Sequence, residues 1–280
     1  MLGPNGAGKT TLIRIINHIT APDSGEVFFD GHQLSQEDIV NIGYLPEERG
    51  LYKKMKVGEQ ALFFARLKGM NKTEATRELK KWFEKFDISD WWNKKVEELS
   101  KGMAQKVQFI VTVLHNPRLL IFDEPFSGFD PINANLLKNE MLALRDKGTT
   151  IIFSTHNMSS VETLCDNITL INKSHNILSG NVDEIRKKQG EGRFALTFQG
   201  QPEKLISVVE PFIENHKIIV PEKIVNPDLT QIVLKLKPEV SFKEVIGIAN
   251  EAVELESFTR ALPSLDEIFI NAVETANNNE

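Results

Sequence analysis

The sequence predicts an α/β fold: a parallel sheet with a helical insertion, followed by a small α+β domain. Three observations support this prediction. Up to about residue 190, short uncharged runs typical of buried strands alternate with amphipathic helical segments. Between about residues 53 and 100 the apolar periodicity is helical throughout. Beyond residue 190 the order becomes strand, helix, two strands, helix, strand and a last helix, which suggests a ferredoxin-like module.

The distribution of charge also divides the chain near residue 190. The 280 residues include 33 basic and 39 acidic side chains, giving a net charge of −6. Residues 1–190 sum to +1 and residues 191–280 to −7, while residues 51–110 carry +6. We therefore expect a first domain over 1–190, with a helical subdomain at about 53–100, and an accessory domain over 191–280. The overall acidity argues against a nucleic-acid partner.

Composition excludes two further classes of protein. Cys165 is the only cysteine in the sequence, so an intrachain disulfide framework and a multi-cysteine metal site are excluded, and a reducing compartment fits best. No run approaches the ~18 apolar residues of a membrane-spanning helix, and the first residues lack the apolar stretch of a signal peptide. We expect any membrane role to depend on a partner.

The elements of the first domain follow from periodicity, caps and turn residues. Strands are predicted at Glu26–Phe29, Ile42–Leu45, Leu119–Phe122, Thr149–Phe153 and Ile168–Ile171. A first helix is predicted from Lys9 to before Pro22, and a second over about Val57–Lys68, with Gly69 as its C-terminal cap. A third begins at Asn71, and Glu74 completes its cap. Further helices are predicted over Ser100–Leu114, Asp130–Gly148 and Met158–Cys165. Trp91-Trp92 is interpreted as the anchor of a turn between helices, with a ligand platform as the alternative.

The accessory domain is interpreted in the same way. Strands are predicted at Arg193–Phe198, Lys217–Val225, Gln231–Leu236 and Leu255–Thr259. Helices are predicted over Glu203–Ile213, after Ser241 with its capping partner Glu244, and after Ser264 with Glu267. Residues 277–279 are expected to form a frayed tail.

The strongest motif lies at the start of the chain and matches the phosphate-binding loop pattern G-x-x-x-x-G-K-[ST]. It consists of Gly3, Pro4, Asn5, Gly6, Ala7, Gly8, Lys9, Thr10 and Thr11. Its glycines let the backbone N–H groups point at phosphate oxygens, and the following helix adds its positive end. Lys9 is expected to contact the β- and γ-phosphates, and the Thr10 hydroxyl to bind Mg²⁺.

The run Leu119–Phe122 delivers Asp123 and Glu124 at the carboxyl end of a buried strand, where open α/β sheets bind ligands. We expect Asp123 to hold Mg²⁺ and Glu124 to polarise the attacking water. A structural ion pair is the alternative for these acids. Because two halves of one site occur in the correct order, the sequence predicts the core of a P-loop NTPase that binds a nucleoside triphosphate.

Several further motifs resemble those of ATP-binding cassette proteins. Leu99-Ser100-Lys101-Gly102-Met103 is similar to the LSGGQ signature, Ser127-Gly128-Phe129-Asp130 to the D-loop, and Ser154-Thr155-His156 to the switch histidine. Ile42–Glu47 stands where the family has its Q-loop. The resemblance covers residues 1 to about 190. The segments at 45–52 and 99–103 look like those of sodium-extrusion-type and related bacterial exporters, which often carry a C-terminal accessory domain.

This resemblance implies a homodimer that clamps two ATP molecules and drives a separate transmembrane permease from the cytoplasmic face of the membrane. Each site would combine the loop of one chain with Ser100 and Gly102 of the other. Glu124 would act as the base, His156 would contact the γ-phosphate, and Asp130 would couple the two sites. The chain would then be an ATPase that energises an exporter, with ATP and Mg²⁺ as cofactors.

The sequence departs from the family pattern at several positions. Glu47 replaces the Gln of the Q-loop, where an anionic contact to Mg²⁺ or water is expected. Lys101 and Met103 replace Gly and Gln in the signature. Only Met1-Leu2 precede the loop, so we expect the family's first strands and its adenine-stacking residue to be absent, as in a fragment or a gene start placed late.

Two other functions stay open from sequence. The missing strands favour a nucleotide-binding module that does not hydrolyse ATP, whereas Lys9, Asp123, Glu124 and His156 oppose it. A cassette ATPase of translation or DNA repair is the third possibility. Such proteins usually carry two cassettes or long coiled-coil insertions, and neither pattern occurs in this sequence.

Overall fold

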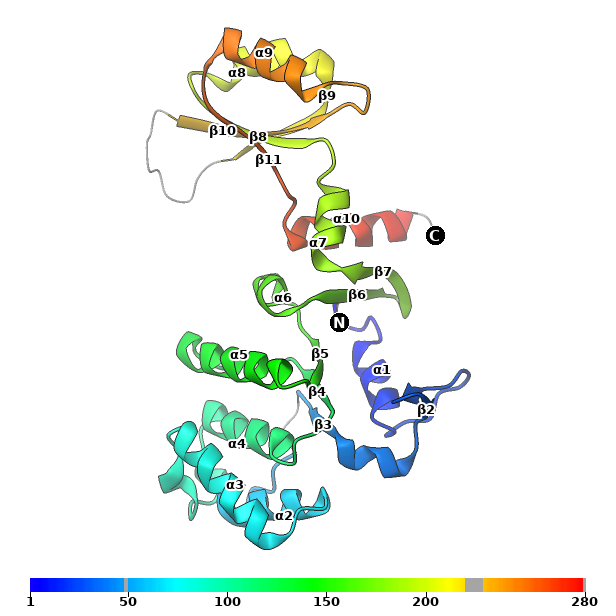
Figure 1. The fold of residues 1–280 in the computed structure, drawn as a ribbon, viewed down its shortest axis with the longest axis vertical. Helices are drawn as coiled ribbons and strands as arrows, with labels where there is room; N and C mark the ends of the chain where they lie inside the picture. The colour runs from blue at the N-terminus through cyan, green and yellow to red at the C-terminus, as the bar shows by residue number, and fades with distance from the viewer. Residues whose placement is uncertain (48–49, 220–228, 279–280) are drawn as a thin grey trace. The chain divides into compact units, whose positions relative to one another are not determined.

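The computed structural model describes residues 1–47, 50–219 and 229–278 and divides the chain into two compact units (Figure 1). The first unit is Met1–Ser179 and the second is Gly180–Glu280. The division therefore lies before the change of charge at residue 190, because α7 (Val182–Gln189) belongs to the second unit and contacts α10 (Leu265–Asn278) there. Among the described residues, no helix has the length and apolar character needed to cross a membrane.

A three-stranded parallel sheet forms the centre of the first unit. Its order is β3 (Ile42–Leu45), β4 (Leu119–Asp123) and β5 (Thr150–Ser154). All five residues of β4 are buried, as expected for a strand with neighbours on both edges and helices on its faces. The register pairs Leu45 with Phe122 and Asp123 with Ser154, so the carboxyl ends of the three strands meet at one edge.

The start of the chain joins this framework through backbone hydrogen bonds. Leu2 forms a parallel bridge with Leu170 of β6 (Asn167–Asn172), and its side chain is buried. The backbone N–H of Thr155, just after β5, donates to the carbonyl of Met1 at 3.3 Å. Residues 1–2 thus fix the start of the glycine-rich loop, which leads to α1 (Lys9–Ile16). Strand β6 also pairs with β7 (His175–Asn181).

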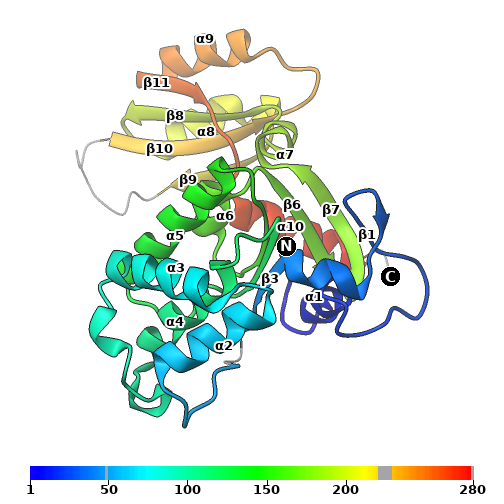
Figure 2. The same ribbon diagram turned by 60° about the horizontal axis from the view of Figure 1, so that its bottom comes forward.

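The predicted helical insertion is present as α2 (Val57–Leu67) and α3 (Lys72–Lys85), which lie beside α4 (Lys101–Val113) in Figures 1 and 2. Aromatic side chains join these helices to the sheet: the rings of Phe109 and Phe122 stack with centroids 5.7 Å apart. Trp92 packs so closely on Gly58 that an added Cβ there would lie 2.4 Å from the indole. The tryptophan therefore anchors the insertion, as the first of the two interpretations predicted.

Most helix ends in the first unit follow the predicted caps. Gly69 adopts a left-handed conformation after α2, and the Asn71 side chain accepts a hydrogen bond from the backbone N–H of Glu74. Asp130 caps α5 (Pro131–Asp146) in the same way, through Ile132 and Asn133. The remaining helix is α6 (Met158–Leu164).

Several predicted boundaries in the first unit were wrong. The first helix ends at Ile16 rather than near Pro22, and the strand expected over Glu26–Phe29 is only β1 (Phe28–Phe29), which pairs with β2 (His32–Gln33). Side-chain periodicity continues past Ile16, but His18 has a φ of +58°, which no α-helix accommodates. The backbone conformation at His18 therefore limits the helix, and the two-residue pairing with β2 limits the strand.

The second unit has the ferredoxin-like topology that the element order predicted. Its strands are β8 (Arg193–Gln199), β9 (Ile213–Ile219), β10 (Leu229–Leu236) and β11 (Glu254–Arg260), in the antiparallel order β11-β8-β10-β9. The connecting helices are α8 (Pro202–Val209) and α9 (Phe242–Ala252). Alternate residues of β8 and β10, such as Leu196 and Leu234, are fully buried in one core with the apolar sides of α8 and α9.

One helix–strand junction of the second unit lies earlier in the sequence than predicted. The helix expected over Glu203–Ile213 ends at Val209, because Pro211 follows in a short 3₁₀ turn and the chain is extended from Ile213. The strand expected over Lys217–Val225 therefore begins earlier, and its residues 220–225 lie outside the described residues. The predicted frayed tail is helical through Asn278, within α10.

The ion pair between Lys85 and Glu140 links the insertion to α5 and yields a first prediction. The Lys85 ammonium lies 2.5 Å from the Glu140 carboxylate, whose side chain is only 9% exposed. Lys85→Met keeps the aliphatic stem near Trp82 but leaves the carboxylate without its cation. We expect the free energy of unfolding to fall by about 1–3 kcal/mol, measured by urea unfolding with tryptophan fluorescence.

The matched control is Lys81→Met, which removes an exposed ion pair with Glu78 on the same helix. Its expected cost is below about 1 kcal/mol. Equal losses in the two variants would contradict the role assigned to Lys85.

Glu267 of α10 yields a second prediction, on the pH dependence of stability. It accepts hydrogen bonds from Arg193 and from Lys217, each at 3.0 Å. Burial raises the pKa of Glu267, but the two cations outweigh burial and hold the pKa below its ordinary value of 4.5. A lowered carboxyl pKa stabilises the fold fully above pH 4.5, and this stabilisation is lost as the pH falls through the folded-state pKa.

We therefore expect Glu267→Gln to reduce the free energy of unfolding at pH 7 by less than about 1 kcal/mol, because the pair is partly exposed. The difference from the wild type should shrink below pH 4.5. Urea unfolding followed by circular dichroism measures both, with the exposed Glu239→Gln as control. A difference that grows in acid would refute the assigned interaction.

Candidate nucleotide-binding site

The glycine-rich loop adopts a conformation that only glycine permits at its ends. A Cβ on Gly3, whose φ is +149°, would lie 2.2 Å from the carbonyl oxygen of Ile171. Gly8 precedes α1 with a φ of +102°. Ala7 is buried between these turns, and its carbonyl accepts a hydrogen bond from the backbone N–H of Ser174 at 3.0 Å. The loop is therefore held by backbone contacts with the β6–β7 connection.

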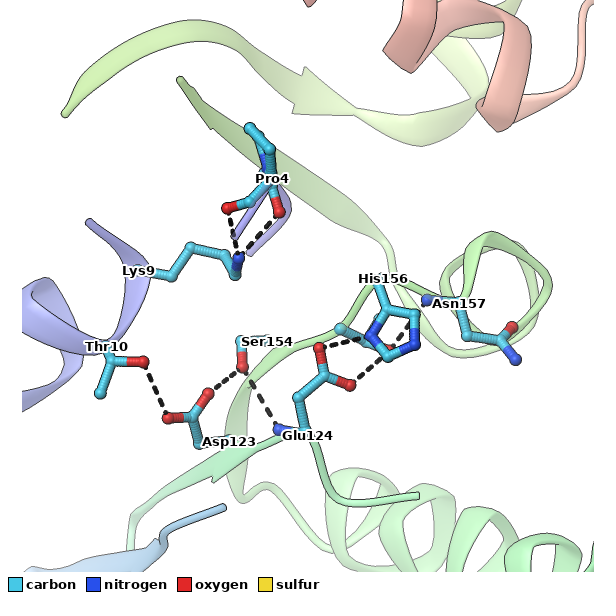
Figure 3. A network of polar contacts seen from close by, with 10 residues as sticks. Pro4, Lys9, Thr10, Asp123, Glu124, Ser154, His156 and Asn157 are labelled. Atoms are coloured by element: carbon cyan, nitrogen blue, oxygen red, sulfur yellow. Dashed lines mark hydrogen bonds and ion pairs between the residues drawn. The ribbon is translucent and has the colours of Figure 1, made fainter. Parts of the chain in front are cut away.

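Lys9 points back over the loop that it follows (Figure 3). Its ammonium donates to the carbonyl oxygens of Gly3 and Pro4, at 2.7 and 3.0 Å. These bonds hold the cation within the curl formed by residues 3–8. A phosphate bound at the loop would therefore meet this charge together with the backbone N–H groups at the start of α1.

Thr10, on the first turn of α1, meets the end of β4. Its hydroxyl donates to one carboxylate oxygen of Asp123 at 3.2 Å. The other oxygen accepts a hydrogen bond from the Ser154 hydroxyl, because the register of β5 pairs Ser154 with Asp123. Asp123 is buried, with 3% of its surface exposed. Hydroxyl and carboxylate oxygens are the donors that Mg²⁺ prefers, so Thr10 and Asp123 fit this ion.

Glu124 and His156 form the second pair of the site. The imidazole Nδ1 lies 2.9 Å from the Glu124 carboxylate, and the Thr155 hydroxyl donates to that carboxylate at 3.4 Å (Figure 3). Glu124 has a left-handed φ of +48°, an unusual conformation for a residue other than glycine. Its backbone N–H is held by the Ser154 carbonyl at 3.2 Å. The backbone thus turns this carboxylate toward His156.

The structure brings some predicted residues together and leaves others apart. Lys9 and the loop, the pair Thr10–Asp123 and the pair Glu124–His156 gather at the carboxyl edge of the sheet (Figure 3). Glu47 follows β3 at the same edge. Its side chain is exposed and, within the described part of the chain, forms no hydrogen bond with Thr10 or Asp123. The described His, Cys, Asp and Glu residues form no group of three arranged to hold a metal ion.

Ser100 and Asp130 cap helices, and Gly102 lies in the first turn of α4. The Ser100 hydroxyl accepts from the backbone N–H of Met103 at 3.3 Å and so caps α4. Hydrogen bonds from the Asn133 backbone and side chain hold the pKa of Asp130 below its usual range. The start of α4, capped by Ser100, lies beside the segment 127–130, and the start of α5, capped by Asp130, is the end of that segment.

Ser154 and Thr155 contact the candidate site residues, and the sequence assigned no role to either hydroxyl. Both hydroxyls come at the end of β5 and bond to the two acids at the end of β4. The available signal was the uncharged run Thr149–Phe153 followed directly by hydroxyl residues. Neighbouring parallel strands end at one edge, so those hydroxyls had to lie near the acids.

Comparisons with known proteins agree with this geometry. The family model described as ABC transporter matches residues 1–127, and the model for the C-terminal domain of DrrA1-3-like ATP-binding proteins matches residues 180–273. The uncharacterized ABC transporter ATP-binding protein YhaQ of Bacillus subtilis is 41% identical over 273 residues, which cover 98% of this chain and 88% of the relative.

Two further relatives extend the comparison. The daunorubicin resistance ATP-binding protein DrrA3 of Streptomyces coeruleorubidus is 26% identical over 97% of this chain and 85% of its own length. A solved ATP-binding subunit of an ABC transporter is 31% identical, with a TM-score of 0.63 over 68% of this chain and 80% of that one. This chain belongs to the ATP-binding subunits of ABC transporters, which bind and hydrolyse ATP to energise membrane transport.

Proposed function

We propose that this chain is the ATP-hydrolysing subunit of an exporter and that Glu124 is its catalytic base. The observation that carries the proposal is the convergence of Lys9, Thr10, Asp123, Glu124 and His156 at one edge of the sheet. Export is supported by the DrrA-like second unit and by the similarity to a daunorubicin resistance protein.

Some of these residues bind ATP and Mg²⁺, and others assist the proton transfer of hydrolysis. Lys9 and the loop residues Gly3–Thr11 would bind the phosphates, and Thr10 and Asp123 would hold Mg²⁺, with Glu47 as a further oxygen donor. When bound, Mg²⁺ would neutralise charge on the β- and γ-phosphates. The Glu124 carboxylate accepts a proton from the attacking water, and His156 orients that carboxylate and contacts the γ-phosphate.

A second copy of the chain completes each site in this proposal. Ser100 and Gly102 lie at the start of α4, whose N-terminal N–H groups attract phosphate. Ile132, two residues after Asp130, is 82% exposed, which is unusual for so large an apolar side chain. A partner copy seated on Asp130 and Ile132 would cover this side chain and bring Ser100 to the opposite ATP.

A membrane permease is the second partner, and the helical insertion offers the surface for it. A cavity of about 260 Å³ lies between β3, the end of α2 and α4, lined mainly by apolar groups that include Tyr44, Phe64 and Leu67. Burial and the neighbouring charge of Lys68 lower the pKa of His115 in its wall to about 4, so this imidazole is neutral at pH 7. An apolar helical segment of a permease would fit such a cavity.

The rim of this cavity adds exposed aromatic and basic side chains. Tyr52, Phe63 and Leu67 are 54%, 40% and 61% exposed. Lys53, Lys54 and Lys56 are exposed beside them, and they account for part of the +6 charge of residues 51–110. Anionic lipid headgroups attract such lysines, which supports a position at the cytoplasmic face of the membrane, bound through the permease.

Glu124→Gln tests the assigned base. We expect kcat for ATP hydrolysis to fall about 10²–10⁴-fold, because the amide cannot accept the proton. ATP binding should persist, and with ATP present the variant should be a dimer in size-exclusion chromatography with light scattering. The control is Asp146→Asn, an exposed carboxylate at the end of α5. Unchanged turnover of Glu124→Gln would refute the assignment.

Leu67→Asp tests the permease surface. A carboxylate at the rim should abolish co-purification with the membrane permease that this chain serves. The ATPase rate of the isolated chain should stay within about twofold of the wild type, since surface substitutions seldom disturb a fold. Ile270→Asp, at a residue 52% exposed in the second unit, serves as control. Full retention of the permease by Leu67→Asp would exclude this surface.

A further inference from the structure

Lys101 stands where the resembling signature motif has glycine, and its side chain lies against the segment 127–130. A Cβ added to Gly128 would lie 2.5 Å from Cε and 2.9 Å from Cδ and Nζ of Lys101. The lysine stem thus covers the face of Gly128 that any other residue would fill with its own side chain. The left-handed φ of +82° at Gly128 turns that face toward α4.

A second contact joins the same two segments one turn along α4. The Gln105 side-chain amide donates to the carbonyl oxygen of Ser127. The Gly128 carbonyl in turn lies over Gly102, 4.0 Å from where a Cβ would stand on that residue. The carbonyls of Ser127 and Gly128 therefore both face the first two turns of α4.

The segment held in this way connects two residues of the proposed site. The Ser127 N–H donates to the Glu124 carbonyl at 3.1 Å, and the Phe129 N–H donates to the Phe126 carbonyl at 3.3 Å. The segment then ends at the Asp130 cap of α5. Glu124 itself keeps an unusual φ of +48°, so its position depends on the residues that follow it.

We propose that Lys101 and Gln105 are positioning residues that fix the segment 124–130 against α4 and so hold the Glu124 carboxylate in place. Packing of the Lys101 stem on Gly128 provides the effect, rather than its charge. The Lys101 side chain is exposed, and its ammonium forms no ion pair or hydrogen bond with the residues that the structure describes. The consequence for turnover rests on the proposed role of Glu124, while the packing itself does not.

The test compares three substitutions in the full chain. Lys101→Ala removes the stem, Lys101→Met keeps it without charge, and Lys101→Arg keeps both stem and charge. We expect kcat of Lys101→Ala to fall about tenfold to a hundredfold, because the Glu124 carboxylate is misplaced. Both Lys101→Met and Lys101→Arg should retain the wild-type rate.

Hydrogen–deuterium exchange gives a readout that does not require ATP hydrolysis. Peptides that cover residues 124–130 should exchange faster in Lys101→Ala, and at the wild-type rate in Lys101→Met. The matched control is Lys106→Ala, which removes a lysine from the same helix without touching Gly128. Equal melting temperatures of the variants would show that the fold is intact.

Two results would overturn the proposal. One is wild-type exchange and turnover in Lys101→Ala. The other is loss of turnover in Lys101→Met with recovery in Lys101→Arg, which would assign the effect to charge. If the wild type itself hydrolysed no ATP, the proposed function would fail, and the exchange experiment would still decide whether Lys101 holds the segment.

Discussion

The register of β4 between β3 and β5 is the constraint on which the site depends. It places Asp123 level with Ser154, and it ends both strands at the edge where Thr10 and the glycine-rich loop arrive. A slip of one residue would turn Asp123 to the opposite face of the sheet and break its contacts with Thr10 and Ser154. Since all five residues of β4 are buried, packing on both faces fixes this register.

The helical insertion depends on the same sheet through α4. Phe109 of α4 stacks on Phe122, and Gln105 and Lys101 contact the segment that follows Glu124. One helix therefore touches the central strand, the segment that follows Glu124, and α2. A movement of the insertion would reach the site through these contacts.

Local patterns predicted much of this molecule, and their failures have identifiable causes. The glycine-rich loop, the buried strands and the caps at Asn71, Ser100 and Asp130 were predicted because each depends on residues close in sequence. The first helix and the helix after Glu203 were predicted too long, because apolar periodicity continued where His18 and Pro211 ended the helices. Strand β7 and helix α7 were missed, although the Asn181 cap, the acids of the first turn and the basic residues of the last turn are local signals of α7.

The sequence by itself determined the two folds, the glycine-rich loop and the two acids at the carboxyl end of β4, because spacing and residue type suffice for these. The succession of strands and helices along the chain also predicted the ferredoxin-like topology of the second unit, which the strand order β11-β8-β10-β9 confirms. Only the tertiary structure decided that Ser154 and Thr155 support the two acids, that His156 lies 2.9 Å from Glu124, and that Lys101 covers Gly128. Each of these contacts joins residues from different elements, and their distances follow from strand register and helix packing, which no local pattern encodes.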